Sequence, residues 1–69
     1  MELWRLEGKK VRVIDMRGNE FIGEVGDYIA ADDQSSDIGE IESIILDVPY
    51  EKYPMEFLKT EIKLIEIIK

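Results

Sequence analysis

Two clusters of charged residues are the parts of this sequence best suited to bind a ligand. The first cluster consists of four carboxylates in an aperiodic polar stretch: Asp32, Asp33, Asp37 and Glu40. Calcium takes about six to eight oxygen ligands, which an EF-hand loop supplies at fixed spacing around a central glycine. This stretch lacks that spacing, so we predict an exposed acidic loop and no metal site.

The second cluster is the only basic patch that the sequence pattern predicts, and it surrounds the first predicted hairpin. Its members are Lys9, Lys10, Arg12 and Arg17. Lys10 and Arg12 alternate with two valines, so both side chains fall on the exposed face of a strand. The patch either pairs with the many glutamates or offers a surface to nucleic acid or to an acidic partner.

Catalytic groups are scarce in this sequence. The chain has no histidine and no cysteine, which excludes the ordinary Ser-His and Cys-His nucleophiles. Ser35, Ser36 and Ser43 have no catalytic motif around them, and the glycines do not form a phosphate-binding loop. We therefore predict that the protein is not an enzyme and needs no cofactor.

Composition restricts the class of protein further. The 69 residues suffice for one small domain, residues 1–69, and 45% hydrophobic with 36% charged residues is typical of a globular one. The net charge of −7 disfavours both nucleic acid and anionic membranes. No apolar run approaches the length of a membrane span, and residues 1–7 lack the apolar core of a signal peptide. We therefore expect a cytoplasmic protein.

The N-terminal half predicts a short helix followed by a hairpin. Apolar residues among the first six predict one or two helical turns ending at Gly8, with Trp4 covering one end of the core. Residues 9–14 alternate as a strand does, and residues 16–19 have turn chemistry, with Gly18 suited to a positive φ.

The return strand is predicted over residues 20–31. Regular alternation places Phe21, Val25 and Ile29 on the same face as Gly23. Glycines inside a strand usually mark a bend, a bulge or a close backbone approach. Gly23 and Gly26 are therefore the positions where we expect the strand to bend.

The C-terminal half predicts further strands. Residues 41–48 form one strand, and residues 49–54 form a loop or an edge strand, because Pro54 cannot donate to a ladder. The isoleucine-rich end favours a strand over 62–68 with apolar side chains on both faces. Regular alternation places Ile62, Leu64 and Ile68 on one face and Ile65 and Ile67 on the other. A second subunit or the N-terminal helix would cover the second face. The residues predicted for an oligomer strand are Ile62, Leu64, Ile65 and Ile67.

These elements predict an all-β protein, a five-stranded, strongly bent barrel with a short N-terminal helix. The motif residues then resemble the Sm/LSm family, whose first motif has matching residues at matching spacing. Those residues are Leu6, Gly8-Lys9, Val11, Val13, Gly18, Phe21, Gly23 and Val25. The match covers about a third of the chain, and it implies an SH3-like, Sm-like barrel that assembles into rings through its fourth and fifth strands.

The resemblance also implies positions for RNA recognition, and the residues there differ from the family pattern. Ile29 stands at the family's Asp position, and Asp32-Asp33 stand where the family has Met-Asn. Lys59-Thr60 are the nearest counterpart of the family's Arg-Gly. Asp33 repels phosphate, and Lys59 lacks the planar surface of an arginine. Asp33, Lys59 and Thr60 are the RNA-binding positions that the resemblance predicts, with uridine recognition altered.

Two functional hypotheses follow. The first is an Sm-like homo-oligomerising module, in a ring or another assembly, that serves as a scaffold or binds RNA weakly. The alternative is a monomeric SH3-like domain that binds a protein partner through the acidic loop and Tyr28, Tyr50 or Tyr53.

Overall fold

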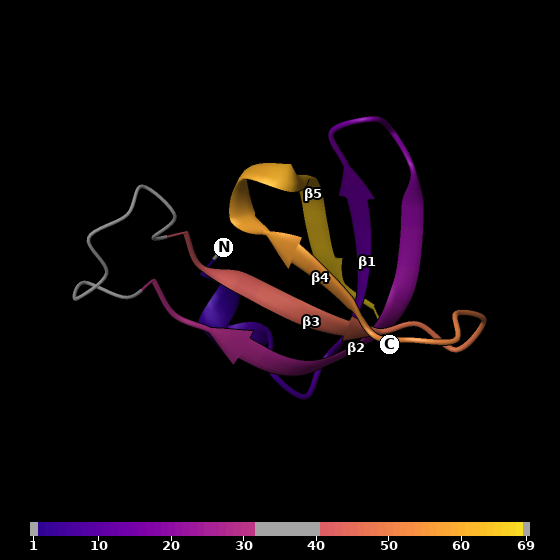
Figure 1. Cartoon of the computed structure of the whole chain (residues 1–69), viewed down its shortest axis with the longest axis horizontal. Helices are drawn as coiled ribbons and strands as arrows, with labels where there is room; N and C mark the ends of the chain where they lie inside the picture. Colours follow the sequence, from indigo (N-terminus) through magenta and orange to yellow (C-terminus); the bar gives the residue numbers. More distant parts are fainter. Residues whose placement is uncertain (1, 32–40, 69) are drawn as a thin grey trace.

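The protein is an all-β chain with two short 3-10 helices, seen here in a computed structural model that describes residues 2–31 and 41–68 (Figure 1). Its five antiparallel strands lie in one sheet of order β4-β3-β2-β1-β5. In chain order the elements are η1 (Leu3–Leu6), β1 (Lys10–Asp15), β2 (Glu20–Ile29), β3 (Ser43–Asp47), β4 (Met55–Leu58), η2 (Lys59–Glu61) and β5 (Ile62–Ile67).

The sheet is curled, because its two outermost strands are joined by η2 alone. Four strand spacings of about 4.8 Å would separate β4 from β5 by about 19 Å in a flat sheet. Three linking residues reach about 14 Å when fully extended, and less as a 3-10 turn. The outer strands therefore approach each other where η2 joins them, and the sheet bends around the core while remaining open (Figure 1).

One hydrophobic core fills the inside of this bend. Its fully or almost fully buried residues come from η1, four of the strands and the residue that follows β3. They are Leu3, Leu6, Val11, Val13, Val25, Ile44, Leu46, Val48 and Phe57. The rings of Phe21 and Phe57 meet with their centroids 5.2 Å apart, which joins the start of β2 to β4.

The N-terminal helix forms where the sequence predicts it, but it covers the core with different residues. In a 3-10 helix, side chains three positions apart lie on the same face. Leu3 and Leu6 are three apart and both are buried, whereas Trp4 is 53% exposed. The predicted role of Trp4 as a cover over the core is therefore wrong, and the two leucines have that role.

Two glycines have the positive φ that their sequence context predicts, and a third lies at a close backbone approach. Gly8 follows η1 with φ +81°, and Gly18 has φ +89° in the turn between β1 and β2. Gly23 is buried where β2 passes the end of β3, and its Cα faces the backbone of Asp47 and Val48. This is the close backbone approach that a glycine inside a strand indicates.

The face assigned to the end of β2 is wrong, because a β-bulge changes the alternation. Val25 pairs with Leu46 and Asp27 pairs with Ile45, so Gly26 has no partner residue on β3. One extra residue moves every later side chain to the opposite face. Tyr28 consequently packs against the core, and Ile29 is 43% exposed instead of sharing the face of Val25.

The faces predicted for the last strand are also wrong, because a second β-bulge interrupts the alternation there. Leu64 pairs with Ile14 and Ile62 pairs with Asp15, so Lys63 is the extra residue on β5. As a result Ile62 packs against the core together with Ile65, although regular alternation would separate them. Of the two alternatives predicted for residues 49–54, the structure has the loop, and the fourth strand, β4, begins after Pro54.

The carboxylate of Asp15 organises the turn between β1 and β2. Its Oδ1 accepts the backbone N–H of Asn19 at 2.8 Å and that of Arg17 at 2.9 Å. The N–H of Asn19 contributes most to lowering the pKa of Asp15 below the usual 3.8. Because the folded pKa is the lower one, this contribution is present above about pH 4 and is lost as the pH falls through the folded pKa.

We therefore expect Asp15→Asn to flatten the acid side of the stability profile. An asparagine retains a side-chain oxygen for the turn but has no charge to titrate. The free energy of unfolding, measured by denaturant titration from about pH 5 to about pH 2, should fall less in Asp15→Asn than in the wild type. Parallel profiles for the two proteins would contradict this role for Asp15.

Candidate functional site: the two open edges of the sheet

The open edges of the sheet are formed by β4 and β5, and backbone hydrogen bonds show which residues face outward. In an antiparallel ladder, alternate residues direct their N–H and C=O groups toward the neighbouring strand. The N–H of Ile68 donates to the carbonyl oxygen of Lys10 at 2.9 Å, so residues 64, 66 and 68 bond toward β1. Ile65 and Ile67 therefore direct their backbone groups to the open edge.

The same reasoning identifies the outward residues of β4. The N–H of Lys59 donates to the carbonyl oxygen of Glu42 at 2.9 Å, which fixes residues 55, 57 and 59 as those bonded toward β3. Glu56 and Leu58 therefore face the open edge. The edges of both strands thus have backbone groups available to an added strand.

The residues predicted for an oligomer strand have two different surroundings. Ile62 and Ile65 pack against the core from partly buried positions. Leu64 is 43% exposed and Ile67 is 47% exposed, on opposite faces of β5. Exposed apolar side chains on both faces of an edge strand are what a partner strand would cover.

A hollow of about 400 Å³ lies beside β5. It is lined by Leu3, Lys59, Ile62, Lys63, Leu64 and Ile65. Its lining combines four apolar side chains with two lysines, so it suits an extended segment with apolar and acidic side chains. At the other edge, Glu56 is exposed and its Oε2 accepts the hydroxyl of buried Ser43 at 2.9 Å. Lys63 therefore lies on β5 and Glu56 on β4, while Lys59 directly follows β4.

Lys59, which the family resemblance assigns to RNA binding, already has an acidic neighbour. Its Nζ lies 3.6 Å from Oε2 of Glu42. The other oxygen of Glu42 accepts the hydroxyl of Tyr28 at 3.3 Å. Burial, followed by the charge of Glu42, raises the pKa of Tyr28. A phosphate that approached Lys59 would thus have to compete with Glu42.

The other two positions assigned to RNA binding do not join Lys59 in one described site. Asp33 lies outside the described residues. Thr60 is exposed in η2 and lines a second open hollow of about 510 Å³, together with Asp15, Met16, Arg17, Asn19 and Glu61. The two consecutive residues of η2 therefore contribute to different hollows.

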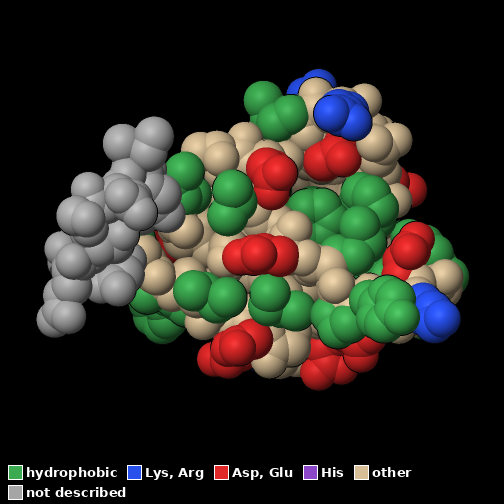
Figure 2. All heavy atoms as spheres, in the orientation of Figure 1, with side chains coloured by type: hydrophobic (Ala, Val, Ile, Leu, Met, Phe, Trp, Pro, Cys, Tyr) green, Lys and Arg blue, Asp and Glu red, His purple; other side chains and the backbone are tan. Residues whose placement is uncertain are grey.

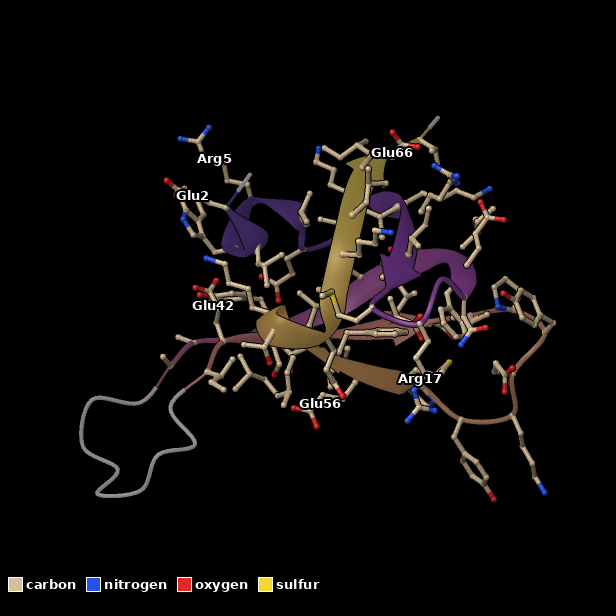
Figure 3. All side chains as sticks on the ribbon, turned by 90° about the horizontal axis from the view of Figure 1, so that it is seen from above. Glu2, Arg5, Arg17, Glu42, Glu56 and Glu66 are labelled. Carbon is tan, nitrogen blue, oxygen red and sulfur yellow. The ribbon has the colours of Figure 1, made fainter. Side chains whose placement is uncertain are left out.

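The basic patch is divided in the structure. Arg12 donates to Glu20 through Nε and to Glu66 through a guanidinium nitrogen at 2.6 Å, and these hydrogen bonds raise its pKa. Lys10 lies opposite Glu24 in the register. Arg17 belongs to the turn, and Figure 3 shows it far from Glu66, a partner of Arg12. Glutamates therefore lie beside Arg12 and opposite Lys10, and Arg17 is separated from Arg12 by the length of the hairpin.

The sheet face over β3 and β4 is also unfavourable for phosphate. Figure 2 shows acidic side chains interspersed with hydrophobic ones on this face, and basic side chains only near its margin. The register places Ile45 between Asp27 and Glu56, with both carboxylates exposed. Carboxylates at this density repel an RNA backbone.

The carboxylates of the predicted acidic loop lie outside the described residues. Within residues 2–31 and 41–68, no group of three or more potential ligands is placed to hold a metal ion. None of the helices in these two segments is long and apolar enough to cross a membrane.

The sequence analysis missed Glu42, Glu56 and Glu61 as residues of the site. Their position relative to the two edges depends on the hydrogen-bond register between strands, and the pattern of a single strand does not contain that register. The short segment between Pro54 and Ile62 is the one signal that could have located the β4 edge. Comparison with known proteins gave no match to any protein-family model, curated protein or solved structure.

Proposed function

We propose that this chain is an Sm-like module that assembles with copies of itself through its sheet edges. In this proposal the curled sheet is an incompletely closed SH3-like barrel, and β4 of one copy pairs with β5 of the next. The observation that carries the proposal is the pair of open edges at opposite ends of one curled sheet. A head-to-tail contact of this kind closes into a ring when its rotation permits.

Side chains near the two edges support the same pairing. Lys63 and the exposed Leu64 and Ile67 lie on β5, and Glu56 lies on β4. Lys63 and Glu56 can attract each other across the contact, and burying the exposed apolar side chains would favour association. An acidic protein of net charge −7 resists its own association, so we expect assembly to be stronger at high salt.

The test is the mass in solution over a range of concentrations, compared between Ile67→Pro and the wild type. Proline removes the N–H of residue 67, which faces the open edge, and leaves the hydrogen bonds between β5 and β1 in place. We expect wild-type masses that are multiples of 8.0 kDa and association about 2- to 10-fold weaker in Ile67→Pro.

Ile67→Val is the matched control, because it changes the side chain slightly and retains the N–H. It should associate as the wild type does. Equal masses for Ile67→Pro and Ile67→Val would show that β5 is not the contact. A wild-type mass of 8.0 kDa at every concentration would overturn the assembly itself.

RNA has a secondary place in this proposal. Glu42 competes for Lys59, and Arg12 is held by two glutamates. We therefore propose at most weak, salt-sensitive RNA binding, through a surface other than the family's uridine site.

A monomeric protein-binding domain is the second candidate function. Tyr50 is 66% exposed and Tyr53 is 70% exposed in the loop between β3 and β4, where they could anchor a partner. Lys52 lies over the ring of Tyr53, 5.5 Å from its centroid. A wild-type mass of one subunit at all concentrations would favour this candidate.

A further inference from the structure

The β4 edge is less open than the β5 edge, because one of its outward groups is already bonded. The backbone N–H of Leu58 faces the open edge, and it donates to Oε1 of Glu61 at 2.9 Å. Glu61 belongs to η2, whose last carbonyl accepts the N–H of Met16 at 3.0 Å. The turn that presents this carboxylate is thereby attached to the hairpin between β1 and β2.

Glu56 is consequently the one described residue of the β4 edge with an unbonded outward N–H. Pro54, which immediately precedes the strand, has no N–H to donate. Leu58 retains only its carbonyl for a partner, because its N–H is bonded to Glu61. By contrast, β5 offers the N–H and C=O groups of both Ile65 and Ile67. The two edges therefore differ in their capacity to receive a strand.

We propose that Glu61 controls strand addition at the β4 edge of this chain. Its carboxylate competes with the carbonyl of an incoming strand for the N–H of Leu58. While Glu61 holds that N–H, a partner strand can form a full pair of hydrogen bonds only at Glu56, which weakens the contact and fixes where the pairing ends. This inference rests on the proposed assembly and adds the residue that limits it.

The test compares Glu61→Ala with Glu61→Gln, using the full chain in both cases. Both variants remove one negative charge, so the general repulsion between copies changes equally. Glutamine retains an oxygen that accepts the N–H of Leu58, whereas alanine leaves this N–H available. One additional hydrogen bond corresponds to association about 2- to 10-fold tighter in Glu61→Ala than in Glu61→Gln, measured by sedimentation or light scattering.

Amide hydrogen exchange at Leu58 provides a second measurement. The amide should exchange faster in the alanine variant than in the glutamine variant when both are dilute and monomeric, and it should become protected as the alanine variant associates. A circular dichroism spectrum and an unfolding curve for each variant identify any loss of the fold.

The three association constants distinguish the role of Glu61 from the proposed assembly. Tighter association of Glu61→Ala than of Glu61→Gln supports the role of Glu61, and a wild type that stays monomeric at every concentration still overturns the proposed assembly of the native chain. Equal association of the two variants, with an assembled wild type, overturns the role of Glu61 and leaves the proposed function standing. Monomers for all three proteins at every concentration overturn both.

Discussion

Replacing Gly23 by alanine should remove about 3 kcal/mol from the free energy of unfolding. A Cβ at position 23 would lie 2.9 Å from the carbonyl carbon of Asp47 and 3.1 Å from Cα of Val48, and nearer still to the carbonyl oxygen of Asp47. All three atoms belong to the backbone, so no side-chain rotation relieves the overlap. To admit the methyl group, the end of β3 must move away from β2.

This expected loss is large for a chain of this size. Domains of 69 residues have a total stability of about 3 to 10 kcal/mol. A displacement at Gly23 also affects two neighbours at once, because Gly23 pairs with Val11 on β1 while its Cα faces the end of β3. Denaturant titration followed by circular dichroism measures the change.

Gly26→Ala is the matched control on the same strand. Its nearest contact would be the carbonyl oxygen of Ile45 at 3.9 Å, an ordinary van der Waals distance. Gly26 is exposed, so the added methyl group should change the free energy of unfolding by about 0.5 kcal/mol or less. If the two variants lose the same small amount, the close approach at Gly23 does not constrain the fold.

The difference between these glycines shows what the sequence can predict about the fold. Both stand inside a strand, which marks them as special, and the structure gives Gly23 the close approach and Gly26 the bulge. Positive φ values at Gly8 and Gly18 were predictable because their sequence context is a helix end and a turn. The sequence pattern therefore located the special backbone positions, although it did not distinguish a close approach from a bulge.

The errors in the predicted strand faces come from the two bulges and have one physical cause. A strand pattern assigns faces by strict alternation, and one unpaired residue reverses every assignment beyond it. The bulge at Gly26 puts Ile29 on the face opposite to the predicted one, and the bulge at Lys63 does the same to Ile62. A bulge is a property of two paired strands. Because a single sequence holds no pairing information, it does not show which side chains a bulge moves to the other face.

The candidate site was predictable to a smaller extent for the same reason. The apolar character of the last strand predicted an edge that a partner would cover; Leu64 and Ile67 are exposed there, and the partner stays a prediction. The glutamates around the β4 edge gave no signal, since 16 acidic residues are spread through the chain. Only the ladder between β3 and β4 distinguishes Glu56 from the other carboxylates, and only the hydrogen bond from the N–H of Leu58 distinguishes Glu61.

The second large effect is expected for Leu6→Ala, which should lower the free energy of unfolding by about 3 kcal/mol. Leu6 is completely buried and joins η1 to the core, beside β2. Its segment is attached to that strand by hydrogen bonds from the N–H of Gly8 to the carbonyl oxygen of Val25 at 2.7 Å and from the N–H of Val25 to the carbonyl oxygen of Lys9 at 2.9 Å. These bonds hold η1 in place, so the core cannot readily collapse into the cavity that the substitution leaves.

Trp4→Ala tests the same helix from its exposed side. Trp4 is the larger residue and would be the more damaging loss if it covered the core, as its position in the sequence suggests. It is 53% exposed instead, with its indole N–H donating to Glu2 and Arg5 stacked on its ring. We therefore expect a loss of about 1 kcal/mol or less for Trp4→Ala. Unfolding curves in which Trp4→Ala costs more than Leu6→Ala would show that the tryptophan, and not the three-residue spacing of the leucines, attaches η1 to the sheet.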